Sequence, residues 1–323
     1  MPRAIAVLDS NIYRSLSEEA LVALMEKERQ VSVVASPCYQ VVQELMAHLV
    51  PGDPEYGLCH AALSRMGRHC RYFNGYSYMF KFVADGLDQV AVAVFGRPVG
   101  DPAMPEVLAG LLGDIVEGCV LRNPEAFAAD FAEIARHVRD ARTDFAAAVR
   151  GIESELAAHL IGADDQERGL RDSGRRAVIC KALESNSVLE GPAGMIYRQL
   201  AEWLDLPTNP LPPAGVARIV EGFPTPLRFF NRVVKGCICD GWRVEGKKRL
   251  GVAHDVRISF LISADARASG VPIWLVTDDQ LIHDAAAAAG LANRVLQGPT
   301  YLDLLADADA IRALAEETSA KTT

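Results

Sequence analysis

The chain opens with Ala4-Ile5-Ala6-Val7-Leu8-Asp9-Ser10-Asn11, in which five consecutive apolar residues run directly into a carboxylate. An apolar run of this length without alternating polar positions predicts a short strand buried on both faces, as in a parallel sheet covered by helices. Open α/β sheets bind their ligands at the carboxyl ends of the strands. We therefore expect Asp9 to lie at a binding edge.

The two ends of the chain both show the alternation of strands and helices that is typical of an α/β domain. After Asp9 we predict a helix over 17–29, a strand over 31–35 and a helix that begins at Ser36-Pro37 and contains Glu44. The alternation resumes with a helix from His254 to about 269, capped by Gly270, then a strand over 272–276 that leads into Thr277-Asp278-Asp279. A helix to 289, a strand at 294–296 and a helix over 301–305 complete a discontinuous core of residues 1–50 and 250–310. Residues 311–323 form a tail, predicted to fray from Glu316.

Residues 51–249 show helical periodicity almost throughout, which predicts an all-α insertion. Its clearest segment is 124–160, where apolar residues step alternately by four and three: Phe127, Phe131, Ile134, Val138, Ala141, Phe145, Ala148 and Ile152. A helix with such a seam lies against another helix. We favour an internal partner over a homodimer through the 124–160 helix.

Composition restricts the class of protein. Half of the residues are hydrophobic and 23% are charged, which is the balance of a soluble globular protein. A net charge of -9 argues against a protein that coats nucleic acid without specificity. No stretch approaches the ~20 apolar residues that span a bilayer, so no membrane association is expected. Seven cysteines without a disulfide framework indicate a reducing cytoplasm, and Cys237-Ile238-Cys239 lacks the further ligands of a zinc site.

Four acidic positions, Asp9, Glu44, Asp255 and Asp279, can meet at one edge of the predicted sheet. Clustered carboxylates repel one another, and a hard divalent cation such as Mg²⁺ or Mn²⁺ relieves that repulsion with oxygen ligands. Such an ion activates water and neutralises charge on a phosphodiester. Asn11 and Thr277 would orient the carboxylates by hydrogen bonds. The residues therefore predict a metal-dependent site for phosphodiester hydrolysis.

In their order and context, Val7-Leu8-Asp9-Ser10-Asn11, Glu44, Asp255 and Val276-Thr277-Asp278-Asp279 resemble the four motifs of PIN-domain nucleases. The resemblance implies a three-layer α/β/α core with a parallel sheet, and cleavage of RNA, or in some branches DNA, with Mg²⁺ or Mn²⁺. It implies that Asp9, Asp255 and Asp279 are direct metal ligands and that Glu44 binds directly or through water. Asp278 is a supporting residue, because the family pattern is Thr, any residue, Asp. The match covers about a third of the chain, and the insertion is far longer than the family's usual segment between the second and third motifs.

Basic residues gather just before Asp255. Residues 228–249 contain seven basic and two acidic side chains, and those expected to bind substrate phosphates are Arg232, Lys235, Arg243, Lys247, Lys248 and Arg249. The interleaved Phe229, Phe230 and Trp242 would stack on bases or belong to the core. A solvated basic face is an equal alternative. The expected partner is nucleic acid, with RNA favoured.

Three other interpretations remain. A phosphatase of the haloacid-dehalogenase type also begins with a strand ending in Asp, but it needs a second Asp at the position of Asn11, which cannot transfer a proton. A catalytically silent PIN-like scaffold would use its helical insertion to bind protein or nucleic acid. The third is a nuclease held inactive by its own insertion or by an inhibitory protein partner.

Overall fold

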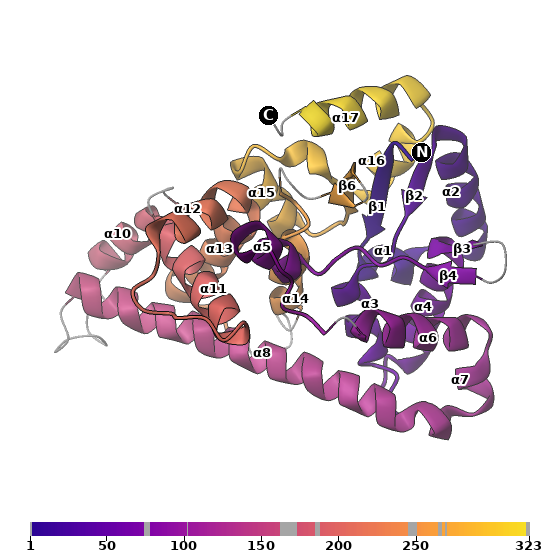
Figure 1. Cartoon of the computed structure of the whole chain (residues 1–323), viewed down its shortest axis with the longest axis horizontal. Helices are drawn as coiled ribbons and strands as arrows, with labels where there is room; N and C mark the ends of the chain where they lie inside the picture. Colours follow the sequence, from indigo (N-terminus) through magenta and orange to yellow (C-terminus); the bar gives the residue numbers. More distant parts are fainter. Residues whose placement is uncertain are drawn as a thin grey trace.

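The computed structural model describes residues 2–73, 78–101, 103–161, 173–184, 188–244, 251–263, 267–268 and 270–320. It shows a mixed α/β protein, mostly helical, with a small parallel sheet (Figure 1). No helix within those ranges is both long and apolar enough to cross a membrane.

The sheet joins strands from the two ends of the chain. Four strands are parallel: β2 (Val33–Ala35), β1 (Ala4–Leu8), β6 (Val271–Val276) and β7 (Val295–Leu296), each paired with the next in that order. β1 is buried at every position, as its uninterrupted apolar sequence predicts. Its register pairs Ile5 with Ile273 and Leu8 with Val276. The residues that follow β1 and β6 are therefore neighbours at one edge.

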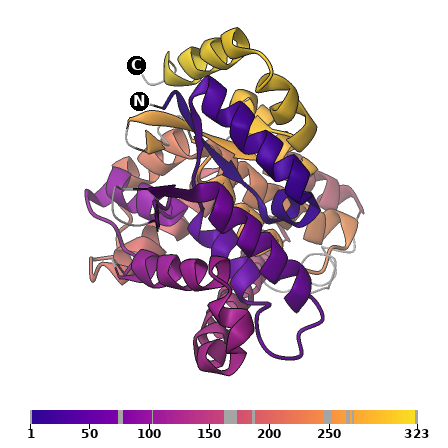
Figure 2. The same ribbon diagram turned by 90° about the vertical axis from the view of Figure 1, so that its right-hand side faces the viewer.

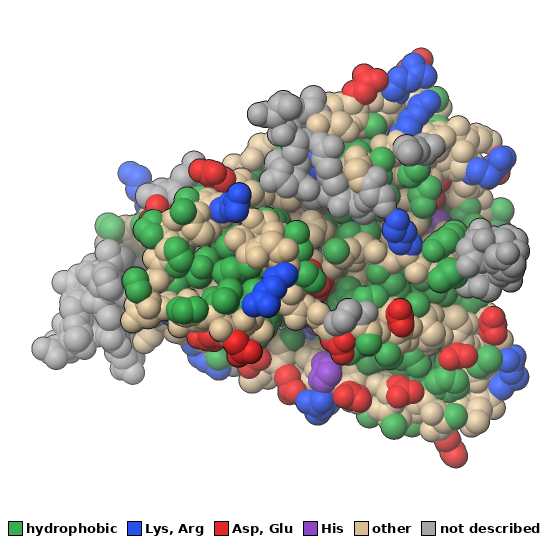
Figure 3. Space-filling model, in the orientation of Figure 1, with side chains coloured by type: hydrophobic (Ala, Val, Ile, Leu, Met, Phe, Trp, Pro, Cys, Tyr) green, Lys and Arg blue, Asp and Glu red, His purple; other side chains and the backbone are tan. Residues whose placement is uncertain are grey.

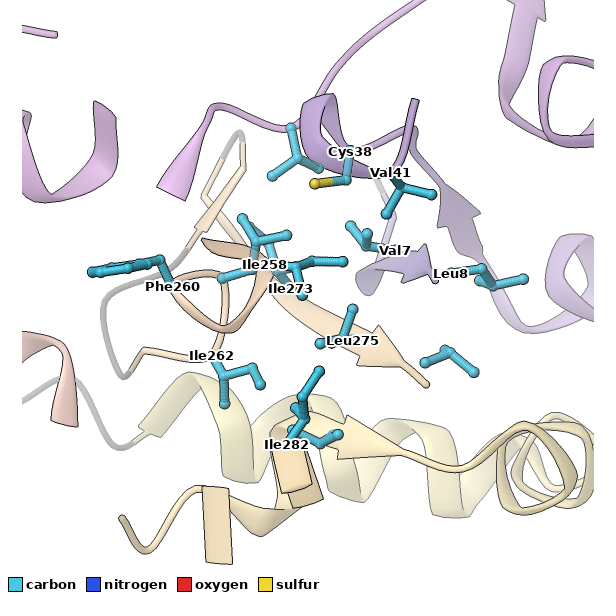
Figure 4. Packing of buried hydrophobic residues seen from close by; sticks show 14 of the residues in the cluster. Val7, Leu8, Cys38, Val41, Ile258, Phe260, Ile262, Ile273, Leu275 and Ile282 are labelled. Atoms are coloured by element: carbon cyan, nitrogen blue, oxygen red, sulfur yellow. The ribbon is translucent and has the colours of Figure 1, made fainter. Parts of the chain in front are cut away.

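Helices cover both faces of the sheet. The covering helices from the two ends are α1 (Ser10–Ser15), α2 (Glu18–Val31), α3 (Tyr39–Met46), α14 (Val252–Ser259), α15 (Gln280–Ala288) and α16 (Gly298–Leu304). Figure 4 shows Cys38 and Val41 on one side of the central strands and Ile282 of α15 on the other, with Leu275 of β6 between them. A 3-10 turn, Ala292–Arg294, leads into β7.

Two predicted helix boundaries are wrong. α14 ends at Ser259 instead of 269, and β5 (Arg267–Ala268) pairs antiparallel with the start of β6. Gly270, with φ +81°, lies between these two strands and is not a helix cap. α3 begins after Pro37, because the carbonyl of Pro37 accepts a hydrogen bond from the backbone N–H of Val83 at 3.0 Å.

The predicted C-terminal tail is a packed helix, α17 (Ala308–Ala320) (Figure 2). Ile311 and Ala315 are buried one turn apart, and they give the helix an apolar side despite its polar composition. The backbone carbonyl of Thr318 accepts a hydrogen bond from the buried guanidinium of Arg294 at 2.5 Å. The prediction that the chain frays from Glu316 was thus wrong for residues 316–320, the last ones that the structure describes.

The middle of the chain is mostly but not entirely helical. Its helices are α4 (Tyr56–Cys70), α5 (Gly86–Phe95), α6 (Met104–Val116), α7 (Cys119–Arg122), α8 (Pro124–Ile161), α10 (Ser173–Glu184), α11 (Glu190–Trp203), α12 (Pro213–Gly222) and α13 (Pro224–Asp240). The strands β3 (Arg71–Phe73) and β4 (Tyr78–Phe80) form an antiparallel pair. The prediction that residues 51–249 are entirely helical was therefore wrong for β3 and β4.

The long helix α8 runs along the lower edge of the molecule in Figure 1 and packs within its own chain. It contacts α3, α13 and α14, and its seam residues Phe131, Ile134 and Val138 are buried. These three seam residues therefore pack against helices of the same chain.

A disulfide joins Cys180 of α10 to Cys239 of α13, with the two Cα atoms 6.7 Å apart. The sequence, with its seven scattered cysteines, predicted no such bridge. The packing of α10 against α13 brings together two cysteines that are 59 positions apart in the chain. Pairing of this kind depends on tertiary packing and leaves no local signal in the sequence.

A buried polar cluster ties α2, α4 and α16 together. The carboxylate of Glu28 accepts a hydrogen bond from the hydroxyl of Tyr301 at 2.5 Å and pairs with Nε2 of His69 at 2.6 Å. Nδ1 of His69 lies 2.9 Å from the hydroxyl of Tyr13 in α1. Each polar atom thus has a partner in a region from which water is excluded, which such a cluster requires.

Candidate metal centre

Asp9 lies where β1 ends and caps helix α1. Its Oδ1 accepts a hydrogen bond from the backbone N–H of Ser10 at 2.6 Å, and its Oδ2 accepts one from the hydroxyl of Thr277 at 2.7 Å. The residue is 6% exposed. Burial, followed by the charge of Glu44, raises its pKa from 3.8 to about 6, although its two hydrogen bonds act in the opposite direction.

Thr277 and Asp279 come directly after the end of β6, the strand that pairs with β1. The backbone N–H of Asp9 donates to the carbonyl of Val276 at 2.9 Å, which keeps the two strand ends in register. Asp279 is the N-cap of α15, where its Oδ1 accepts from the N–H of Leu281 at 2.7 Å. The charge of Asp279 raises the pKa values of both Asp9 and Asp255. Asp279 thus serves both as the N-cap of α15 and as a member of the charged cluster.

Asp255 and Glu44 come from the helices α14 and α3. Burial raises the pKa of Asp255 well above its usual range, and the charges of Asp9, Asp279 and Glu44 raise it further. Glu44 is half-buried. The structure therefore brings together the four carboxylates named from the sequence, which come from opposite ends of the chain. The negative charges of their neighbours in the cluster raise the pKa values of Asp9 and Asp255, as expected for carboxylates that repel.

These carboxylates do not form a compact set of metal ligands. No three of them place ligand oxygens within 4.8 Å of one another, in contrast to a different set described below. Mg²⁺ commonly keeps several waters and binds proteins through one or two carboxylates. The donors are all carboxylate oxygens, and neither Asp9 nor Asp255 forms a salt bridge with a residue that the structure describes. The residues present therefore fit a hydrated hard divalent cation better than a closed zinc centre.

The supporting residues differ in their roles. Thr277 contacts Asp9 directly, whereas Oδ1 of Asn11 is buried and has no hydrogen-bond partner within the described part of the chain. The Nδ2 group of Asn11, which would have to donate the expected hydrogen bond, makes none to a carboxylate among these residues. Asp278 is exposed and accepts a hydrogen bond from the backbone N–H of Gly298 at 3.0 Å, at the start of α16.

Arg142 of α8 is a site residue that our reading of the sequence missed. Its charge lowers the pKa of Asp255, against the four raising effects. The available signal was a basic residue beside the apolar seam of the 124–160 helix. That signal does not reveal which neighbour the side chain faces.

The basic residues predicted to bind substrate are largely engaged elsewhere. Arg232 forms an ion pair with Asp284 at 3.1 Å, and Lys235 pairs with Glu184. Arg243 is exposed, and the predicted Lys247, Lys248 and Arg249 lie outside the described residues. On the face drawn in Figure 3, Lys and Arg side chains lie singly among acidic ones.

The aromatic residues of that segment belong to the protein interior. Phe229 is fully buried, and Phe230 packs edge-on against Phe145 with ring centroids 5.7 Å apart. Base stacking by these two residues was thus a wrong alternative, and membership of the core was the correct one.

A second group of ligand-type side chains lies near Glu44 but is already neutralised. Ligand atoms of His48, Glu55 and Cys59 lie within 4.8 Å of one another. The guanidinium of Arg14 pairs with Glu55 at 3.1 Å and donates to the sulfur of Cys59 at 3.3 Å. A cation already occupies this position, so the group is explained without a metal.

A cavity of about 990 Å³ lies away from the carboxylates. None of the four lines it; its wall includes Asp85 and Arg257, which form an ion pair at 3.1 Å. Asp255 and Arg257 are two residues apart on α14, so their side chains point about 200° apart around the helix axis. We place the candidate site by its chemistry and not by the size of this cavity.

Comparison with protein-family models, with curated proteins and with solved structures gives no significant match to this chain.

Proposed function

We propose that this chain is a Mg²⁺- or Mn²⁺-dependent nuclease, with RNA favoured as its substrate. One observation carries the proposal: Asp9, which is buried, and Asp255, which is half-buried, come from opposite ends of the sequence, and the charge of Asp9 helps to raise the pKa of Asp255. Desolvated carboxylates that repel one another reduce stability, and a bound cation is the usual reason for such a cluster. The resemblance of the four motifs to PIN-domain nucleases supports the same function.

The finer architecture belongs to this proposal. Residues 1–50 and 250–310 would form a three-layer PIN-like core, with 51–249 as an insertion between the second and third acidic motifs. The parallel pairing of β1 with β6 supports a core made from both ends. Helix α17 would extend that core beyond 310.

In the proposed site, Asp9, Asp255 and Asp279 would hold the ion, with Glu44 binding directly or through water. The ion supplies an activated water and neutralises the charge that develops on the phosphodiester. The hydroxyl of Thr277 and the N–H of Ser10 fix both oxygens of Asp9, so the carboxylate is oriented before any ligand binds. The unpaired Oδ1 of Asn11 can accept a hydrogen bond from a water held there.

The test is cleavage of labelled single- and double-stranded RNA and DNA with Mn²⁺, Mg²⁺ or EDTA, by the wild type and by Asp9→Asn and Asp279→Asn. Asp278→Asn is the matched control, because this exposed neighbour lies outside the cluster. We expect metal-dependent cutting of RNA that both site variants lose and the control keeps. Absence of both cutting and Mn²⁺ binding by calorimetry would refute the nuclease and leave the silent scaffold. Binding without cutting would indicate a nuclease held inactive by the insertion or by a partner protein.

A further inference from the structure

One positive charge interrupts the buried stripe of α8. The stripe comprises Phe131, Ile134, Val138, Ala146 and Val149, all buried. Arg142 lies one turn after Val138 and one turn before Ala146, on the same side of the helix. Arg142 itself is half-buried, and the part of a guanidinium that leaves water needs hydrogen-bond acceptors around it.

The described residues do not provide those acceptors. The Nε atom of Arg142 is buried without a hydrogen-bond partner, and the guanidinium forms no ion pair within 4.0 Å in the described ranges. Two other arginines near the site are engaged: Arg257 pairs with Asp85 and Arg14 with Glu55, each at 3.1 Å. Arg142 is thus held in place with its hydrogen-bonding capacity unused.

The position of α8 directs this charge toward the carboxylates. α8 lies against both α3 and α14, the helices that carry Glu44 and Asp255. About one turn further on, Phe145 borders a cavity of about 290 Å³ that Val256 of α14 also borders, so this part of α8 lies near α14. The charge of Arg142 acts on Asp255 without forming a salt bridge to it.

We propose that Arg142 binds a phosphate of the nucleic-acid strand at the carboxylate site, so that the insertion contributes directly to substrate binding. A guanidinium presents two parallel N–H donors that match phosphate oxygens. A phosphate between Arg142 and the metal-loaded cluster would accept hydrogen bonds from Arg142 and also bind the metal ion. The inference rests on the proposed function in so far as it takes a nucleic-acid phosphate as the ligand. The inference adds that residues 51–249 supply a substrate-binding side chain to the site.

The experiment measures binding separately from cutting. A fluorescein-labelled single-stranded RNA oligonucleotide is titrated with full-length wild type, Arg142→Ala, Arg142→Lys and the control Arg139→Ala, in EDTA and in Ca²⁺, with anisotropy as readout. Arg139 is exposed on the same helix, and its removal changes the net charge equally. Mn²⁺ calorimetry and thermal melts of each variant report on the metal site and on folding.

We expect Arg142→Ala to weaken RNA binding by about 10- to 100-fold, as loss of a charged hydrogen bond does. Arg139→Ala should change it by less than about 3-fold, and Arg142→Lys should restore part of the loss. Mn²⁺ affinity should stay equal or rise when the nearby positive charge is removed, whereas a purely structural role for Arg142 would lower the melting temperature and Mn²⁺ affinity together.

Equal RNA affinity of Arg142→Ala and Arg139→Ala, or no RNA binding by the wild type, would overturn the inference. A wild type that never cuts, combined with selective loss of RNA binding in Arg142→Ala, would refute the nuclease and retain the phosphate ligand. The two failures are therefore distinguishable.

Discussion

Replacing Asp9 by Asn should stabilise the metal-free protein, and the gain should grow with pH. The Asp9 carboxyl has a folded-state pKa raised from 3.8 to about 6, so folding opposes its ionisation. Asn resembles the neutral acid in shape: its Oδ1 can still accept the hydrogen bond from the Ser10 N–H, and its Nδ2 can donate to the Thr277 hydroxyl, which then accepts instead of donating. The substitution removes the charge while retaining most of the geometry.

The magnitude follows from the linkage of protonation to folding. At about 1.4 kcal/mol per pH unit, ionised Asp9 costs the folded state about 3 kcal/mol at pH 7.5. The cost is absent below pH 3.8, where both states are protonated, and complete above about pH 6. At pH 5 it is about 1.5 kcal/mol. Stability of the wild type relative to Asp9→Asn thus falls as pH rises through this window.

The assay is urea unfolding in EDTA at pH 5 and pH 7.5, followed by circular dichroism, for wild type, Asp9→Asn and the exposed control Asp278→Asn. Comparing variants at each pH cancels the titration of every other group that the substitution does not disturb. Saturating Mn²⁺, at about 100 times its Kd, should add about 2.7 kcal/mol to the wild type and little to Asp9→Asn, closing most of the difference.

A variant that is no more stable than wild type at pH 7.5, or a gain of equal size at both pH values, would refute the reasoning. Either result would mean that the carboxylate is not desolvated and repelled in the folded protein. A control that gains as much as Asp9→Asn would show that the effect comes from net charge alone.

Further predictions concern the supports of the site. Glu28→Gln should cost about 3–5 kcal/mol in urea unfolding, because it leaves the buried ring of His69 without its carboxylate, and a loss below about 1 kcal/mol would contradict that pairing. Phe131→Ala should cost about 3–5 kcal/mol by leaving a cavity under α8, and an unchanged midpoint would show that this helix is not docked. Reduction should free the thiols of Cys180 and Cys239, which mass spectrometry can locate, and should lower the melting temperature, with a loss of about 2–4 kcal/mol in the free energy of unfolding. Finding the thiols of Cys180 and Cys239 already free before reductant is added would contradict the bridge.

The sequence predicted the sheet and the acidic residues well, because both depend on local patterns. An apolar run such as 4–8 has few alternatives to a buried strand, and a carboxylate after it must lie at the strand end. Helix ends were harder to predict. The apolar residues after Ser259 suit either a longer helix or a turn packed in the core, and only tertiary contacts select the second. α17 was missed because its apolar side consists of few residues, Ile311 and Ala315 among them.

Arg142 and the pairing of Cys180 with Cys239 could not be predicted for a related reason. Periodicity reveals which side of a helix is buried but not which helix it faces. Both features arise from contacts between segments far apart in the chain, and a single sequence carries no record of those contacts.

The pairing of β1 with β6 has a consequence during synthesis. The hydroxyl of Thr277 reaches Asp9 across 268 positions of sequence. β1 can pair with β2 early, but its second neighbour, β6, leaves the ribosome only when almost the whole polypeptide has been made. Contacts of such long range form late in folding. A nascent chain that stops short of β6 lacks Asp279 and one of the two strands that pair with β1, so its carboxylate cluster is not assembled. A nuclease built in this way would stay harmless to the message being translated until translation is nearly finished.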